Sequence, residues 1–166
     1  INYYSYFRKK AYKDNFSNVI FPFLGKEYYF SLFGSKGFAE NQILIPCEKV
    51  IPFIYDFKKL IDFHKPIITL FSVKEMSGEH KYLRFEGNMI SLTFDIANNK
   101  KKLNFINDLD KLYISYKVVP SIIKDSGLKK EVFNKCYKFA NKFREDLKNF
   151  DNRRSYKSEL SDRLEL

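Results

Sequence analysis

Lys124 stands where an apolar run ends and a strongly helical stretch begins. The run is PSIIK, residues 120–124, and Asp125 and Ser126 follow it directly. A lysine at the end of a strand has a fixed base and a long stem. Its ammonium group can therefore reach an anionic ligand or a negative charge that develops during a reaction. The alternative is a solvent-exposed lysine that pairs with Asp125 or with a helix end, and spacing alone favours that alternative.

The residue types that most often bind metals or form disulfides are few and scattered. Cys47 and Cys136 are too few for a disulfide framework, and His64 and His80 stand alone. No Cys-x-x-Cys or His-Glu-x-x-His motif occurs, so the sequence predicts no metal site. The longest clean apolar run, near 66–73, falls far short of the roughly 20 residues that cross a bilayer.

The composition indicates one globular domain with a positive charge. The 166 residues include 18 Phe and 12 Tyr, and 45% of them are hydrophobic, which is enough to bury a core. The net charge of +10 fits an anionic partner, such as nucleic acid, a phosphorylated ligand or an acidic membrane surface. It also fits a solvated lysine surface, because the lysines are scattered and the one local basic run, Lys100–Lys102, is short.

Hydrophobic periodicity predicts an α+β domain in which helices cover an antiparallel sheet. Strand patterns occur at 37–46, 66–76, 80–86, 88–97 and 118–124. Helical patterns occur at 50–61, 98–117 and about 127–149, and a further short helix is expected in the tail. The three strands between residues 66 and 97 should form a meander. Pro120 implies an edge strand or a bulge, and Asp125 and Ser126 are candidate helix caps.

The segment 121–166 contains an ordered set of features: a strand, Lys-Asp-Ser, the helix VFNKCYKFANKFRE, Asp151, the aromatic Tyr156 and the final SELSDRLEL. This order resembles the C-terminal segment of FAD-linked oxidoreductases of the vanillyl-alcohol oxidase superfamily, most of all the decaprenylphosphoryl-β-D-ribose oxidase group. That group has Ala-Lys-Asp-Ser, a helix, an arginine-rich stretch, Asp-Pro, Phe, Ser-Asp and a terminal Arg-Leu.

Four upstream pieces extend the resemblance. FPFL (21–24) is similar to the family's Phe-x-Pro-Leu stretch, and YSYFRK (4–9) to its Trp-Tyr-Arg-Lys arm. LFGSKGFAENQILIP (32–46) resembles its Tyr-Gly-x-x-Gly-Phe-x-Gln-Tyr-Gln-apolar-Pro run, and EGNMISLTFDI (86–96) resembles a strand that ends in Asp-Phe-Pro. The match covers nearly the whole chain as short pieces, of which the terminal segment is the most specific.

The resemblance implies a substrate-binding part, residues 1–124, and a helical segment, 125–166, that would pack toward an N-terminal FAD-binding domain expected before Ile1. That domain would hold most of the FAD, so this chain alone would be an inactive fragment. The implied reaction is oxidation of a sugar or alcohol hydroxyl, with a polyprenyl-phosphoryl pentose oxidised at its 2-position as the expected substrate. A separate NAD(P)H-dependent reductase would complete an epimerisation.

The resemblance also assigns roles to individual residues. Lys124 would stabilise the reduced flavin and assist loss of the hydroxyl proton. Gln42 would hydrogen-bond a sugar hydroxyl, or be a strand residue that faces solvent. Lys74 would contact a phosphate, or be an exposed strand lysine. Ser91 would face the pocket where mycobacterial enzymes have a cysteine, or be an ordinary small residue.

Two more residues complete the expected pocket. Tyr6 would replace an aromatic residue of the pocket wall, and Phe33 takes the place of the family's tyrosine before the glycine. Glu40 replaces the first glutamine of the family's Gln-x-Gln pair. The changes at positions 33 and 40 both alter polar contacts of the family site.

Two other functions remain open on the sequence. The first is a basic nucleic-acid-binding module, which the lack of an RNP-like strand pattern disfavours, so no nucleic-acid partner is expected. The second is a protein-interaction domain without catalysis. The expected location is cytoplasmic or peripheral at the inner membrane, with a peripheral membrane contact consistent with a lipid-linked substrate.

Overall fold

A computed structural model describes residues 13, 15–16, 33–79, 82–83, 85–124 and 127–166. The chain divides into two compact units, Ile1–Ser35 and Lys36–Leu166. The first element whose bounds are described is a 3₁₀ helix, η1 (Gly34–Lys36), and every residue after it belongs to the second unit. The functional division at residues 124 and 125 that the resemblance implies stays a prediction.

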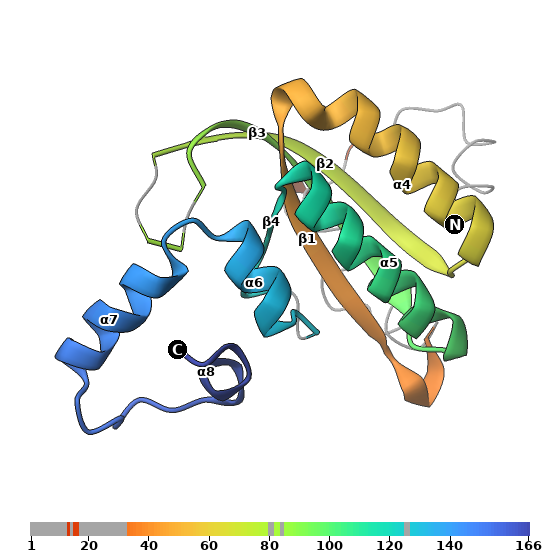
Figure 1. The fold of residues 1–166 in the computed structure, drawn as a ribbon. Coiled ribbons are helices and arrows are strands. Elements are labelled where there is room, and N and C mark those ends of the chain that lie inside the picture. Colours follow the sequence, from red (N-terminus) through yellow and green to blue (C-terminus); the bar gives the residue numbers. More distant parts are fainter. Residues whose placement is uncertain (1–12, 14, 17–32, 80–81, 84, 125–126) are drawn as a thin grey trace. The chain divides into compact units, whose positions relative to one another are not determined.

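Four antiparallel strands form the sheet of the second unit (Figure 1). They are β1 (Phe38–Pro46), β2 (Ile68–Gly78), β3 (Gly87–Ala97) and β4 (Val119–Pro120), in the spatial order β2-β3-β1-β4. The fold is α+β with an antiparallel sheet, as the sequence predicts. Pro120 lies in an edge strand, where the missing backbone N–H breaks no central ladder.

Two long helices cover one face of the sheet (Figure 1). They are α4 (Val50–His64), which follows the short η2 (Cys47–Lys49), and α5 (Lys100–Tyr116). Phe57 of α4 is 3% exposed, and its ring centroid lies 5.3 Å from Phe94 of β3 and 6.2 Å from Phe105 of α5. Burial of a side chain of this size contributes about 1.5–3 kcal/mol, so these aromatic contacts fix both helices on the sheet.

The meander predicted between residues 66 and 97 is wrong, because 80–86 contains no strand among its described residues. Tyr82 and Leu83 lie in a bend, and Tyr82 has a left-handed φ of 56°. The Tyr82 ring packs edge-on against Phe143, with centroids 5.9 Å apart. The described residues of this loop pair with neither strand, so β2 pairs directly with β3, and β3 pairs on its other side with β1.

The helix predicted over 127–149 is interrupted. The structure has α6 (Lys130–Cys136) and α7 (Ala140–Phe150), and Lys129 is the N-cap residue of α6 in place of the expected Asp125 or Ser126. Tyr137 leaves the helical conformation (φ −103°, ψ 104°), and its buried hydroxyl donates a hydrogen bond to the carbonyl of Pro120. That contact with β4 outweighs the continuous apolar periodicity of the sequence.

The chain ends with the short helix that the sequence predicts, α8 (Glu159–Leu164). Ser158 and Ser161 form a capping box at its start, in which each side chain bonds the backbone N–H of the other residue. Leu164 is fully buried and joins the common core. No helix in the described part of the chain has both the length and the apolar character to span a bilayer.

Candidate functional site

The sheet face opposite α4 and α5 carries a row of polar side chains. Side chains alternate between faces along a strand, and directly paired residues share a face. Because Ile43 and Phe94 belong to the helix-covered core, Gln42 and Ser91 belong to the other face. Gln42 Nε2 donates a hydrogen bond to Ser91 Oγ at 3.0 Å, and Ser91 is 1% exposed.

Lys74 lies on the same face as Ser91. The two are direct partners in the β2–β3 register, so their Cβ atoms are neighbours across the strands. Lys74 is exposed and forms no ion pair with another described residue. The structure therefore brings three residues singled out in the sequence, Gln42, Ser91 and Lys74, onto one surface of three adjacent strands.

Lys124 lies beside a fourth residue of this face. Its Nζ is 3.0 Å from Oε1 of Glu40, which is two positions before Gln42 on β1 and so points to the same side. Both side chains are partly exposed, at 43% for Lys124 and 38% for Glu40. The carboxylate of Glu40 thus holds the lysine at the margin of the polar face. Among the described residues, Lys124 pairs with Glu40 and with no helix end.

A hollow of about 400 Å³ adjoins this face. Its lining residues are Gln42, Leu44, Met76, Leu83, Phe85, Val119, Ser121, Ile122, Ile123 and Tyr137. Most are apolar, and Gln42 supplies an amide among them. The residue directly before Lys124 also belongs to the lining. A ligand with an apolar part and at least one hydroxyl matches this combination of groups.

Two polar residues of the same face escaped the sequence analysis. Thr93 is 8% exposed and Asp95 is 3% exposed, both on β3 at alternate positions after Ser91. Thr93 is the direct partner of Gln42. Strand alternation from Ser91 was enough to assign both to this face, but nothing in the sequence indicates that polar side chains there are buried.

The structure does not test the two remaining predicted pocket residues. Tyr6 lies outside the described residues, so its expected place in a pocket wall stays a prediction. Phe33 is partly buried and belongs to the unit Ile1–Ser35, so its expected role also stays a prediction. No group of three or more His, Cys, Asp or Glu residues in the described ranges is arranged to hold a metal ion.

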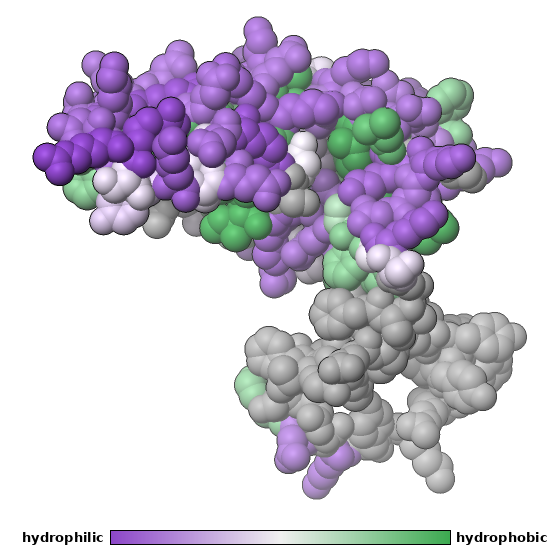
Figure 2. Space-filling model, turned by 90° about the horizontal axis from the view of Figure 1, so that it is seen from below, coloured by the Kyte–Doolittle hydropathy of each residue, from purple (hydrophilic) through white to green (hydrophobic). Residues whose placement is uncertain are grey.

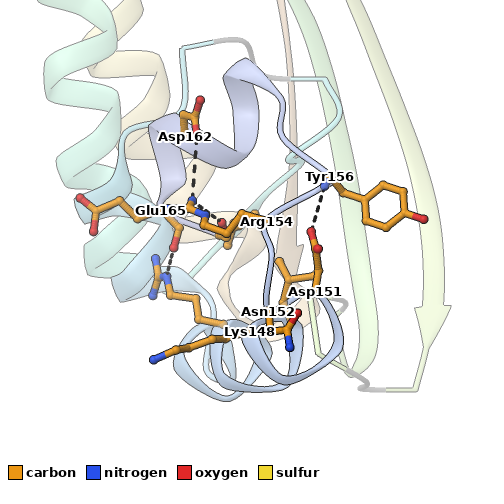
Figure 3. A pocket seen from close by; sticks show the side chains of 10 residues that line it. Lys148, Asp151, Asn152, Arg154, Tyr156, Asp162 and Glu165 are labelled. Carbon is orange, nitrogen blue, oxygen red and sulfur yellow. Dashed lines mark hydrogen bonds and ion pairs between the residues drawn. The ribbon is translucent and has the colours of Figure 1, made fainter.

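A second hollow, of about 510 Å³, lies between α7 and the C-terminal residues (Figure 3). Arg144 donates to the carbonyls of Leu164 and Glu165, and Arg154 reaches toward Asp162 at 3.9 Å. Asp151 accepts the backbone N–H groups of Tyr156 and Ser155, which lowers the pKa of its carboxyl.

Apart from Lys148, the charged groups that line this second hollow are therefore engaged with other side chains or with the backbone. Lys130 of α6 also pairs with Glu165, which lowers the pKa of that carboxyl. The arrangement fastens α8 and the final residues to α6 and α7. We assign it a structural role, and we take the polar sheet face as the candidate functional site.

No protein-family model and no curated protein matches this chain.

Proposed function

We propose that this chain is the substrate-binding part of an FAD-dependent oxidoreductase that oxidises a sugar or alcohol hydroxyl. The observation that carries the proposal is the Gln42–Ser91 hydrogen bond beside Lys74. Because Ser91 Oγ accepts from Gln42, its own hydrogen remains able to donate, and the Gln42 carbonyl remains able to accept. Such paired donors and acceptors recognise sugar hydroxyl groups.

Lys74 on the polar sheet face and the adjoining hollow suggest how the rest of the substrate would bind. A lysine binds phosphate as a compact point charge, so Lys74 would contact the phosphate of a polyprenyl-phosphoryl pentose. The apolar lining of the adjoining hollow, with Leu44, Met76 and Ile123, would contact the first part of the lipid. The 2-hydroxyl of the pentose, which is the group that is oxidised, would then lie near Gln42 and Ser91.

FAD fits this chain only in part. Gly78 and Gly87 are partners across β2 and β3, and Gly37 lies just before β1, so the described residues form no glycine-rich phosphate cradle and FAD would be held mainly by the expected N-terminal domain. When bound, the flavin would accept the hydride. Lys124 would be the residue of this chain that faces it, because its ammonium group can stabilise negative charge. Glu40 would position that ammonium group. A separate NAD(P)H-dependent reductase remains the expected partner.

The test is the flavin chemistry of the protein expressed from its complete gene. Purified protein should be yellow, and anaerobic mixing with a polyprenyl-phosphoryl pentose should bleach the flavin. Lys124→Ala should slow the bleaching by about 100-fold, the usual effect of losing one electrostatic group in a reaction. Lys138→Ala, at an exposed residue of the connection between α6 and α7, is the matched control and should bleach normally. A colourless protein contradicts the proposal.

One observation favours a protein-interaction domain as the second candidate. The strand β2 is at the edge of the described sheet, and Phe71 and Val73 on it are 50% and 65% exposed. An exposed edge strand with apolar side chains is a template for pairing with another chain. A stable complex that Phe71→Lys abolishes, in a protein that binds no flavin, would favour this candidate over the oxidoreductase.

A further inference from the structure

A groove of about 770 Å³ lies at the beginning of α5, and none of the candidate-site residues is among those that line it. Its lining residues are Lys36, Asn98, Asn99, Lys100, Lys102, Leu103, Ile106, Asn107, Gly127 and Lys129. We call it the lysine groove. It includes part of the one local basic run of the sequence, Lys100–Lys102. The oxidoreductase proposal assigns no role to this run.

Two lysines of the lysine groove, Lys36 and Lys100, have a positive charge that no described carboxylate neutralises. None of its lining residues is an aspartate or a glutamate. Lys129 bonds Asp110 at 2.7 Å, but Lys36 and Lys100 form no ion pair with any other described residue. Other exposed lysines do have carboxylate partners on their own helix, such as Lys58 with Asp62 and Lys111 with Asp108.

The position of the basic run is unfavourable for the helix itself. Lys100, Lys101 and Lys102 open α5, and its first turn has no acidic residue. The partial positive charge at a helix N-terminus repels such cations, so the helix dipole gives no reason for them. Lys102 Nζ does donate a hydrogen bond to Asn98 Oδ1 at 2.7 Å, but Lys100 forms no such contact with another described residue. Departures from local preference of this kind are concentrated at functional surfaces. An external anion would offset the repulsion.

The groove also exposes an apolar side chain among the lysines. Leu103 is 66% exposed, and the half-buried Ile106 lines the groove one helical turn further on. Long lysine stems add apolar surface while their ammonium groups extend outward. Single-stranded nucleic acid is held by aromatic rings that stack on bases, and the groove contains none. An apolar centre with a cationic rim matches the boundary between anionic headgroups and acyl chains.

We infer that the lysine groove is a docking surface for anionic phospholipid membranes. The lysines contact the headgroups, and Leu103 enters the boundary between the headgroups and the acyl chains. Most of the described surface in Figure 2 is hydrophilic with scattered apolar residues, so binding that depends on one particular leucine distinguishes this groove from general surface charge. The inference goes beyond the proposed oxidoreductase function and does not depend on it.

Co-sedimentation with vesicles tests the inference. The protein should bind vesicles of equimolar phosphatidylcholine and phosphatidylglycerol, should not bind phosphatidylcholine alone, and should dissociate as salt is added. Each lysine near an anionic surface changes the affinity about five-fold, so Lys36→Gln combined with Lys100→Gln should weaken binding about 25-fold. Leu103→Ser should weaken binding without changing its salt dependence.

The matched control removes two lysines elsewhere. Lys135→Gln with Lys142→Gln, on exposed positions of α6 and α7, changes the net charge equally and should leave vesicle binding unchanged. An equal loss in both double variants would overturn the inference, because net charge alone would then explain binding. A single-stranded oligonucleotide that displaces the vesicles, and that the groove variants no longer bind, would also overturn it. Far-UV circular dichroism of each exposed-residue variant checks that the fold is kept.

Discussion

Lys124 Nζ lies 3.0 Å from Glu40 Oε1, and the contact joins two residues that are 84 positions apart. It links the loop after the edge strand β4 to the first strand of the sheet. Since Glu40 shares its face with Gln42, the contact places the ammonium group of Lys124 next to the polar face that carries the candidate site. The pair therefore orients the lysine.

The first prediction concerns the energy of this pair. Glu40→Ala, Lys124→Ala and the double variant form a thermodynamic cycle, measured by urea unfolding. Both side chains are more than a third exposed, so solvent screens the attraction. The coupling energy should be about 0.2–1 kcal/mol. A coupling of more than about 2 kcal/mol would show that the pair holds the fold together, which contradicts a mainly orienting role.

The second prediction concerns the aromatic core between α4 and the sheet. Phe57→Ala should lower the free energy of unfolding by about 3–5 kcal/mol, because it leaves a cavity beside Phe94 and Phe105. Ile51→Ala on the same helix is the control, since Ile51 is 80% exposed and its loss should cost less than about 0.5 kcal/mol. Similar losses of stability in both variants would contradict the described packing of α4, in which Phe57 faces the core and Ile51 faces solvent.

Local patterns were enough to predict most elements of the second unit. An apolar run that ends at Pro46 identified β1, alternation identified β3, and three- and four-residue spacing identified α4 and α5, because these patterns follow the apolar side chains that pack on the core. The same alternation on β3 places Thr93 and Asp95 on the face of Ser91, so their face could have been predicted from the sequence.

Contacts between distant residues explain what the sequence did not reveal. The break after α6 depends on the bond from Tyr137 to Pro120, and the loss of the expected strand at 80–86 accompanies the packing of Tyr82 on Phe143. The position of β1 between β3 and β4 is also a pairing of remote segments. Local propensity is overridden by such packing, and single-sequence patterns carry no information about it.

The third prediction separates the two cysteines by their reactivity. Burial raises the pKa of the Cys136 thiol to about 12, so almost none of it is thiolate at neutral or mildly basic pH. Cys47 is exposed. Iodoacetamide at about pH 8, near the pKa of a free thiol, should label Cys47 in the native protein and leave Cys136 unlabelled, as read by peptide mass spectrometry. Unfolding in urea should make both react. Fast native labelling of Cys136 would contradict its burial.

The fourth prediction concerns stability in acid and the contacts of Asp151 with the segment before α8, which we call the C-terminal clamp. Two backbone N–H groups bond its carboxylate and lower its pKa below the unfolded value. Its contribution is therefore fully present above the unfolded pKa of about 3.9, and it disappears as the pH falls through the folded pKa. Asp151→Asn should be less stable than the wild-type protein at neutral pH, and the difference should shrink on acidification.

A matched variant distinguishes this clamp from the general protonation of surface carboxylates. Asp162→Asn removes a charge from an exposed side chain of α8 whose contact with Arg154, at 3.9 Å, is long. That variant should keep the acid dependence of the wild-type protein, measured as the free energy of unfolding in urea between about pH 2 and 6, a range that spans the usual carboxyl pKa values. If both variants changed the pH dependence of the unfolding free energy equally, the backbone hydrogen bonds to Asp151 would not explain that dependence. The hollow of Figure 3 would then have to be considered again as a site for a ligand.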